Sequence, residues 1–252
     1  MDVSSIVLLH GFTQTSGSWD GVAARLCDRH AVRALDLPGH GAAGEERAGL
    51  WETAALVAET GGRATYIGYS LGGRVALHVA IARPDVVERL VLVGATAGID
   101  DDEERAARRR ADEELAARIE EIGVDAFLTE WLAQPLFADL PPDAAGLAER
   151  RSNTAEGLAA SLRASGTGMM DPPLWDRLEP IEAPVLVIAG ELDVKFRRLG
   201  ASLVRGIGDH AELVVVAGAG PAVPFEQPER FTDALERWFE ATDEPSRGDP
   251  SG

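Results

Sequence analysis

Short, mainly apolar runs recur along the chain, and turn residues bound each of them. Runs of this length are typical of strands that are buried on both faces of a parallel sheet. Helix-like stretches separate them, and the resulting alternation predicts a doubly wound α/β domain. The predicted strands cover residues 6–9, 31–35, 64–69, 90–93, 185–189 and 213–216. The predicted helices cover residues 19–27, 50–59, 72–82, 197–204 and 228–241.

The alternation breaks over residues 99–170, which contain no strand-like run. The segment begins with the charged sequence DDDEERAARRRADEELAARIEE, which is typical of helix. A helical insertion in an open α/β sheet is expected to lie over the carboxyl ends of the strands, where active sites occur. We therefore predict a core of residues 1–98 and 171–241 with a helical cap of residues 99–170. The polar, Pro- and Gly-rich residues 242–252 predict a disordered tail.

Composition limits the partners of such a domain. The chain has 252 residues, of which 45% are hydrophobic, so it can bury one sizeable core. Its formal net charge of −18 argues against nucleic acid and against an anionic membrane surface as partners. The first apolar run is too short for a signal peptide or a membrane span, and the single cysteine, Cys27, fits a reducing compartment. We expect a cytoplasmic protein that is a monomer or a small homo-oligomer.

A nucleophile turn is predicted where the run 64–69 meets the following helix. The sequence there is Gly68-x-Ser70-x-Gly72, in which small residues permit a turn that exposes the serine hydroxyl above the sheet. The alternative is a plain turn with a helix-capping serine. The backbone N–H groups of Leu71 and of Phe12, in the sequence LLHGF, are candidates for an oxyanion hole. We expect His10 in that sequence to stabilise the loop.

The acidic partner of such a serine belongs after a later strand. Asp193 follows the predicted strand 185–189, and the order of serine before aspartate along the chain is that of α/β hydrolases. Glu191 is the competing carboxylate. We favour Asp193 because of its place in the turn.

These motifs resemble the α/β-hydrolase superfamily and, more narrowly, the 2-succinyl-6-hydroxy-2,4-cyclohexadiene-1-carboxylate (SHCHC) synthases of menaquinone biosynthesis. The resemblance extends over nearly the whole chain, the predicted cap included. It implies a lyase that eliminates pyruvate from a succinyl-enolpyruvyl-hydroxycyclohexene carboxylate, without a cofactor or a metal. The matching segments are DLPGHG at 36–41, GYSLGGRVA at 68–76, EERAARRRAD at 103–112, EWLAQPLFADL at 130–140, RSN at 151–153 and GELDVKF at 190–196.

The resemblance also nominates residues that bind a small polycarboxylate substrate. Arginines suit this task because each guanidinium can hold a carboxylate with two parallel hydrogen bonds. Arg109 is an alternative to Arg108 if the register slips by one, and an exposed ion pair is the alternative role for each arginine taken alone. The nominated residues are Tyr69, Arg74, Arg108, Trp131, Arg151 and Lys195.

One position departs from the pattern of the family. After the last strand the family has Gly-His, followed shortly by an acidic residue and Pro, and here the segment 220–228 is GPAVPFEQP. Pro221 therefore stands where the resemblance expects the catalytic histidine, and proline has no proton acceptor in its side chain. Among the other histidines, only His10 and His40 are expected at the carboxyl ends of the strands, whereas His30, His78 and His210 are expected away from the site.

Three hypotheses follow from this departure. In the first, the protein is a SHCHC synthase-like lyase whose turnover is impaired by Pro221. In the second, it is a general serine hydrolase of the same fold that acts on esters. In the third, it is a non-catalytic protein that binds an anionic ligand.

Overall fold

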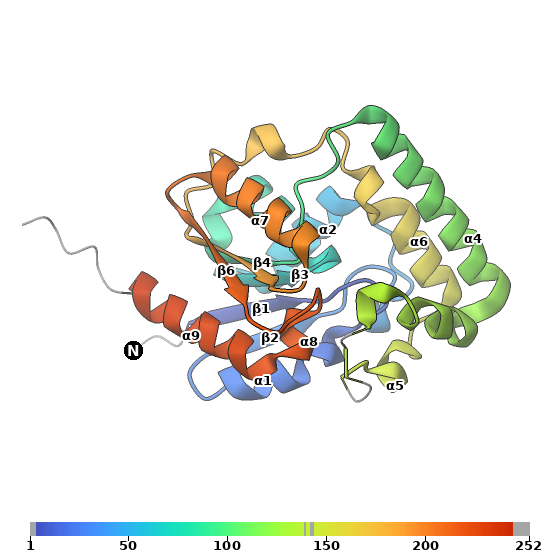
Figure 1. Ribbon diagram of the computed structural model, residues 1–252, viewed down its shortest axis with the longest axis horizontal. Helices are drawn as coiled ribbons and strands as arrows, with labels where there is room; N and C mark the ends of the chain where they lie inside the picture. The colour runs from blue at the N-terminus through green and yellow to red at the C-terminus, as the bar shows by residue number, and fades with distance from the viewer. Residues whose placement is uncertain (1–3, 139, 142–143, 244–252) are drawn as a thin grey trace, which may run out of the picture.

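Six parallel strands form a single sheet in the order β2-β1-β3-β4-β5-β6 (Figure 1). The computed structural model describes residues 4–138, 140–141 and 144–243. The register aligns Leu9 of β1 with Gly68 of β3, and Gly68 with Leu92 of β4. The carboxyl ends of the central strands therefore meet at one edge. The strands are β1 (Ser5–Leu9), β2 (Ala31–Leu35), β3 (Ala64–Tyr69), β4 (Val87–Val93), β5 (Val185–Gly190) and β6 (Ala211–Val216).

Helices cover both faces of the sheet, because nearly every strand residue is apolar and needs cover on either side. One face packs against α2 (Leu50–Gly61), α3 (Leu71–Ala82) and α7 (Val194–Ile207). The other packs against α1 (Asp20–Leu26) and α9 (Pro228–Asp243), which Figure 1 shows along one side of the sheet. Shorter helical turns are η1 (Ser16–Trp19), η2 (Gly41–Ala43), η3 (Pro84–Val86), η6 (Trp175–Arg177) and α8 (Val223–Glu226).

A helical segment of residues 99–170 leaves the carboxyl end of β4 and returns before β5. Figure 1 shows α4 and α6 side by side beyond one end of the sheet. Phe127 and Ile119 of α4 pack against Leu158 of α6 in a small core of their own. Gly123 has a φ of +75°, which breaks α4 into two helical parts. The elements are α4 (Asp102–Leu132), η4 (Pro135–Phe137), α5 (Leu147–Arg150), α6 (Ala155–Ser165) and η5 (Thr167–Met169).

All six predicted strands and all five predicted helices are present, and the predicted α/β-hydrolase fold class is confirmed. Several predicted boundaries were wrong by two or three residues, among them the start of β4 at Val87 rather than 90. Helix α7 begins at Val194 rather than 197, because the Asp193 carboxylate accepts the N–H of Phe196 and caps the helix. Helix α9 continues to Asp243, so residues 242 and 243, which the prediction placed in the tail, are helical. The rest of the predicted tail, residues 244–252, lies outside the described residues.

Tertiary contacts explain the longer C-terminal helix. Thr242 donates its hydroxyl to the carbonyl of Trp238 at 2.9 Å and accepts Arg89 Nε at 2.8 Å. Trp238 and Phe239 in the same helix are buried against the sheet. In the described part of the chain, no helix is both long enough and apolar enough to cross a membrane.

Candidate active site

The turn between β3 and α3 holds Ser70 in a strained backbone conformation. Its φ of +54° is rare for a residue with a side chain, and such strain concentrates at functional turns. A Cβ atom at Gly68 would lie 2.2 Å from the carbonyl oxygen of Gly72, and one at Gly72 would lie 2.1 Å from that of Leu9. Only glycine fits at these two positions, so the Gly-x-Ser-x-Gly spacing has a direct steric cause.

Two backbone amides near Ser70 are free to bind an anion. Phe12 and Leu71 both line the same cavity as Ser70. Within the described residues, neither of their N–H groups donates to a protein acceptor. The loop that carries Phe12 is tied to helix α3, because Gly72 N donates to the His10 carbonyl at 2.9 Å. The helical segment holds it too, through Asn153 Nδ2 and the Thr13 carbonyl at 2.8 Å. This geometry suits an oxyanion hole.

The cavity has a volume of about 630 Å³ and lies between the sheet edge and the helical segment. The core contributes the Ser70 turn and the loops after β1, β5 and β6. Its wall from the helical segment comes from α4, α6, η5 and the turn that follows α4. The predicted site residues that line it are Phe12, Tyr69, Ser70, Leu71, Arg74, Arg108, Trp131, Asp193, Lys195 and Pro221.

Two arginines supply positive charge to this cavity. Arg74 donates from Nη2 to the Ser165 carbonyl at 3.0 Å, and its Nε is buried without a partner among the described residues. Burial, and then the charge of Arg108, lower the pKa of Arg74 to about 10. Arg74 is therefore charged at neutral pH, and a bound anion would relieve the cost of its burial.

Asp112 is a site residue that the sequence analysis missed. Its Oδ1 accepts Arg108 Nε at 2.8 Å, and only 6% of its side chain is exposed. Its Oδ2 is buried and has no partner among the described residues. This contact uses Arg108 Nε and leaves both Nη atoms for a ligand. The sequence did carry a signal for this contact, because Arg108 and Asp112 are four residues apart in one predicted helix and side chains at that spacing are neighbours.

Two other arginines lie elsewhere. Arg109 donates to the Gly168 carbonyl at 2.6 Å and to Asp171 at 2.5 Å, so the structure favours Arg108 over Arg109 as the cavity residue. Arg151 pairs with Asp125 at 2.8 Å, with 52% of its side chain exposed, and is not among the described lining residues. At the end of α5 the neighbouring Arg150 is buried instead, so a role of Arg151 in substrate binding stays a prediction.

Asp193 has one carboxylate oxygen without a partner. Oδ1 accepts Phe196 N at 3.0 Å, whereas Oδ2 is buried and has no partner among the described residues. The competing carboxylate, Glu191, is exposed and accepts Gly218 N at 2.9 Å. Of the two, only Asp193 lines the cavity.

The turn that carries Pro221 is fixed by a buttressing carboxylate. Glu226 accepts the backbone N–H of Ala222 at 2.8 Å and also that of Gly220, so it clamps the two residues that flank Pro221. Gly220 and Ala219 press closely on Gly190 of β5, where an added Cβ would lie 2.0 Å from the Gly220 carbonyl oxygen. The position of residue 221 is therefore set by the fold rather than by its own side chain.

Three histidines, His10, His40 and His78, have side-chain contacts outside the lining of this cavity. His10 accepts Leu37 N at Nε2 and contacts the Gly11 carbonyl through Nδ1, as expected for a residue that stabilises the loop. Burial lowers the pKa of His10 to about 4 and that of His40 to about 3. His78 contacts the Arg74 carbonyl at 2.7 Å. No histidine is among the described residues that line the cavity.

Aromatic side chains form the remaining wall. Trp131 stacks on Phe127 and meets the ring of Phe12 edge-on, and its buried Nε1 has no partner among the described residues. Burial raises the pKa of Tyr69, whose hydroxyl is therefore a neutral donor. Lys195 lies at the start of α7 with its Nζ over the Phe196 ring. The cavity thus combines apolar surface with unpaired hydrogen-bond donors.

A parallel doubly wound sheet with a serine on a strained strand-to-helix turn defines the class of α/β hydrolases. The alpha/beta hydrolase family model matches residues 6–234, and the chain belongs to this family.

Closer relatives are SHCHC synthases. The chain is 34% identical to that of Citrobacter koseri over 84% of this chain and 89% of the relative, and 33% identical to that of Enterobacter sp. over 88% and 86%. Among solved structures, MenH from S. aureus superimposes with a TM-score of 0.88 at 28% identity, covering 96% of this chain and 95% of that one. A thermophilic esterase from Thermogutta terrifontis superimposes with a TM-score of 0.77 at 26% identity, covering 94% and 90%.

Proposed function

We propose that the protein is a SHCHC synthase-like lyase that eliminates pyruvate from 2-succinyl-5-enolpyruvyl-6-hydroxy-3-cyclohexene-1-carboxylate. The observation that carries the proposal is that Arg74 and Arg108 both line the cavity that contains Ser70. A substrate with several carboxylates needs cations in the site, because the overall field of a chain with a net charge of −18 repels anions. The relatives named SHCHC synthase support the same reaction.

The proposed roles follow from which polar atoms are unpaired. The two arginines would hold carboxylates, with Trp131 Nε1 as a further donor and Lys195 near the rim. Ser70, after giving up its own proton, would take a proton from a ring carbon. The electron pair left on that carbon would form a new ring double bond, and the C–O bond to the enolpyruvyl group would break with its electrons on oxygen. The enolpyruvate that leaves would take up a proton and become pyruvate. The amides of Phe12 and Leu71 would stabilise the oxyanion charge that develops. Residues 99–170 would act as a cap that keeps water from this reaction.

Pro221 sets the expected rate. A serine hydroxyl needs a base to accept its proton. Asp193, the candidate acid in the same cavity, retains an unpaired oxygen where a histidine N–H would donate. Loss of one member of such a triad costs about 10⁴-fold or more in turnover. We therefore propose binding of the substrate with weak turnover. The second candidate function is an anion-binding protein without catalysis. Pro221 favours it too, because this residue cannot act as the base.

The test measures pyruvate release from the enolpyruvyl substrate by the protein and by the Pro221→His variant. We expect the variant to gain at least about 100-fold, because it would restore an acceptor between Ser70 and Asp193. Ser70→Ala in the variant background is the matched control and should abolish the gain. Hydrolysis of p-nitrophenyl esters is assayed in parallel, because a preference for the ester would identify a general hydrolase.

Binding separates the remaining outcomes. Calorimetry with the substrate should give saturable binding to the protein itself. Binding without pyruvate release in either protein would identify the anion-binding alternative. Neither binding nor release would refute the assignment, and release that survives Ser70→Ala would refute the serine mechanism.

The proposal includes a cytoplasmic location, which rests on the single Cys27 and the expected pathway. It also includes a monomer or a small homo-oligomer as the working form.

A further inference from the structure

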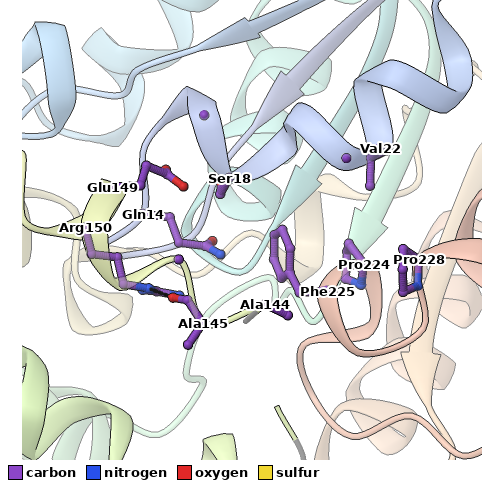
Figure 2. Close-up of a pocket in the computed structure, with 13 residues that line it drawn as sticks. Gln14, Ser18, Val22, Ala144, Ala145, Glu149, Arg150, Pro224, Phe225 and Pro228 are labelled. Carbon is purple, nitrogen blue, oxygen red and sulfur yellow. Dashed lines mark hydrogen bonds between the residues drawn. The ribbon is translucent and has the colours of Figure 1, made fainter. Parts of the chain in front are cut away.

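A second cavity lies behind the loop that carries Phe12. Its volume is about 290 Å³, and among the described residues it shares no lining residue with the first cavity. Its walls come from the start of α1, the region around α5, and the α8–α9 turn (Figure 2). Volumes of about 300–1,000 Å³ are usual for sites of drug-sized ligands, so this cavity fits only a small molecule.

Two buried side chains present hydrogen-bond donors to this cavity. Arg150 and Gln14 are each 3% exposed, and Figure 2 shows both side chains pointing into the space between Ala145 and Phe225. The hydrogen bonds of Arg150 use Nε and Nη1, and that of Gln14 uses Oε1. Within the described residues, Arg150 Nη2 and Gln14 Nε2 donate to no protein acceptor. An oxygen ligand that accepts from both would use two donors that the described residues leave unpaired.

Both donors are held in place before any ligand arrives. Arg150 Nε donates to the Ala145 carbonyl at 2.7 Å, and Nη1 donates to the Thr13 hydroxyl. Gln14 Oε1 accepts Gly11 N at 2.9 Å, which orients its amide nitrogen away from the backbone. Because these side chains are already ordered, binding would cost little conformational entropy.

The described lining residues of the cavity offer one cation, so they can pair with at most one carboxylate. Arg150 is the cation among the described lining residues. Glu149 faces the same space, but its Oε1 already accepts the backbone N–H of Thr15 at 3.0 Å and the Thr15 hydroxyl. A second carboxylate on the ligand would find no further cation among those residues and would be repelled by Glu149.

The opposite wall is apolar. Val22 is 2% exposed, and Pro224 is also buried. The ring of Phe225 is fixed between Trp19 and Tyr69, with centroid distances of 5.5 and 5.4 Å. We propose that this second cavity binds a small monocarboxylate with a compact apolar body, with the carboxylate on Arg150 and Gln14 and the body against Phe225.

The test uses benzoate as the probe and calorimetry as the measurement. Gln14→Glu keeps an oxygen for Gly11 N but replaces the amide nitrogen with a charged oxygen beside Arg150. We expect this change to weaken benzoate binding at least tenfold. Gln227→Glu adds the same charge at a side chain that does not line the cavity, and binding should stay within twofold. Neutral benzamide should bind the protein much more weakly than benzoate.

A second variant covers the case in which Gln14→Glu does not fold. Gly21 lies at the rim in α1, and an added Cβ would meet nothing within 4 Å, so Gly21→Phe can enter the opening without a backbone clash. It should abolish binding, whereas Gly21→Ala should not.

Arg108→Gln, which alters the first cavity, should leave benzoate binding intact. If it abolishes binding while Gln14→Glu and Gly21→Phe do not, benzoate occupies the first cavity and the inference is refuted. Absence of saturable binding by the unaltered protein at millimolar benzoate also refutes it. Since no arm measures pyruvate release, failure here is separate from failure of the proposed lyase function.

Discussion

Three buried histidines should make the stability of this protein depend steeply on pH. His10 and His40 are fully buried, with ring centroids 4.9 Å apart, and His78 is 1% exposed. Burial is the main cause that lowers their pKa values, to about 4 for His10 and His78 and about 3 for His40. In the unfolded chain each ring has a pKa of about 6.5.

The direction of the effect follows from proton counts. Below pH 6.5 the three imidazole rings are protonated in the unfolded chain, whereas in the folded protein they stay neutral down to about pH 4. The free energy of unfolding is therefore highest above pH 6.5 and falls as the pH drops from 6.5 towards 4. Each histidine should cost about 1.8 kcal/mol between pH 7 and pH 5, and the three together roughly 5.5 kcal/mol. That loss is comparable with the whole stability of a typical domain, about 5–15 kcal/mol.

The assay is urea unfolding at several pH values between 8 and 5, followed by tryptophan fluorescence and circular dichroism at constant ionic strength. The matched variant is His40→Asn, which removes one titrating ring and keeps a side-chain N–H near the Pro38 carbonyl that His40 Nδ1 contacts at 3.2 Å. We expect its loss of stability between pH 7 and pH 5 to be smaller by about 2 kcal/mol.

Two results would refute this reasoning. One is an unfolding free energy that stays constant within about 1 kcal/mol from pH 7 to pH 5. The other is a His40→Asn variant whose pH dependence matches that of the unaltered protein. Direct NMR titration of the imidazole rings would then show which histidine is protonated in the folded state.

Three further predictions concern the turn, the arginines and the helical segment. Gly72→Ala should lower the free energy of unfolding by about 1–3 kcal/mol or prevent folding, because its Cβ would overlap the Leu9 carbonyl. Urea unfolding measures this loss, and a loss below about 1 kcal/mol would contradict the prediction. Arg108→Gln should weaken binding of the enolpyruvyl substrate at least about tenfold, whereas Arg109→Gln should change it less than about threefold; equal effects in calorimetry would contradict the assignment. Phe127→Ala should cost about 3–5 kcal/mol in urea unfolding because the ring is 1% exposed, and a cost below about 1 kcal/mol would show that the core of the helical segment is loosely packed.

Much of the fold could be predicted because its signals are local. Short apolar runs separated by helices predict strands that are buried on both faces, and all six are present. The glycines at 68 and 72 predict the turn at Ser70. The steric limit at Gly68 comes from Gly72 within the turn, whereas the limit at Gly72 comes from Leu9 of β1. The position of Asp193 after a strand also predicted that it would lie near the serine turn, although its role as a helix cap was not predicted.

The orientation of the arginines needed the tertiary structure. Arg108 and Arg109 are adjacent in a helix that carries charge on most faces, and each residue rotates the side-chain direction by about 100°. Sequence therefore cannot say which one faces the cavity, nor that Arg150 turns inward while Arg151 remains exposed. Asp112 and the second cavity depend on contacts between segments that are distant in the chain. The sequence by itself determined the strands, the turn at Ser70 and the proline at position 221, because these are properties of short segments. Tertiary packing alone decided which charged side chains meet, because burial and pairing are set by what lies opposite each residue.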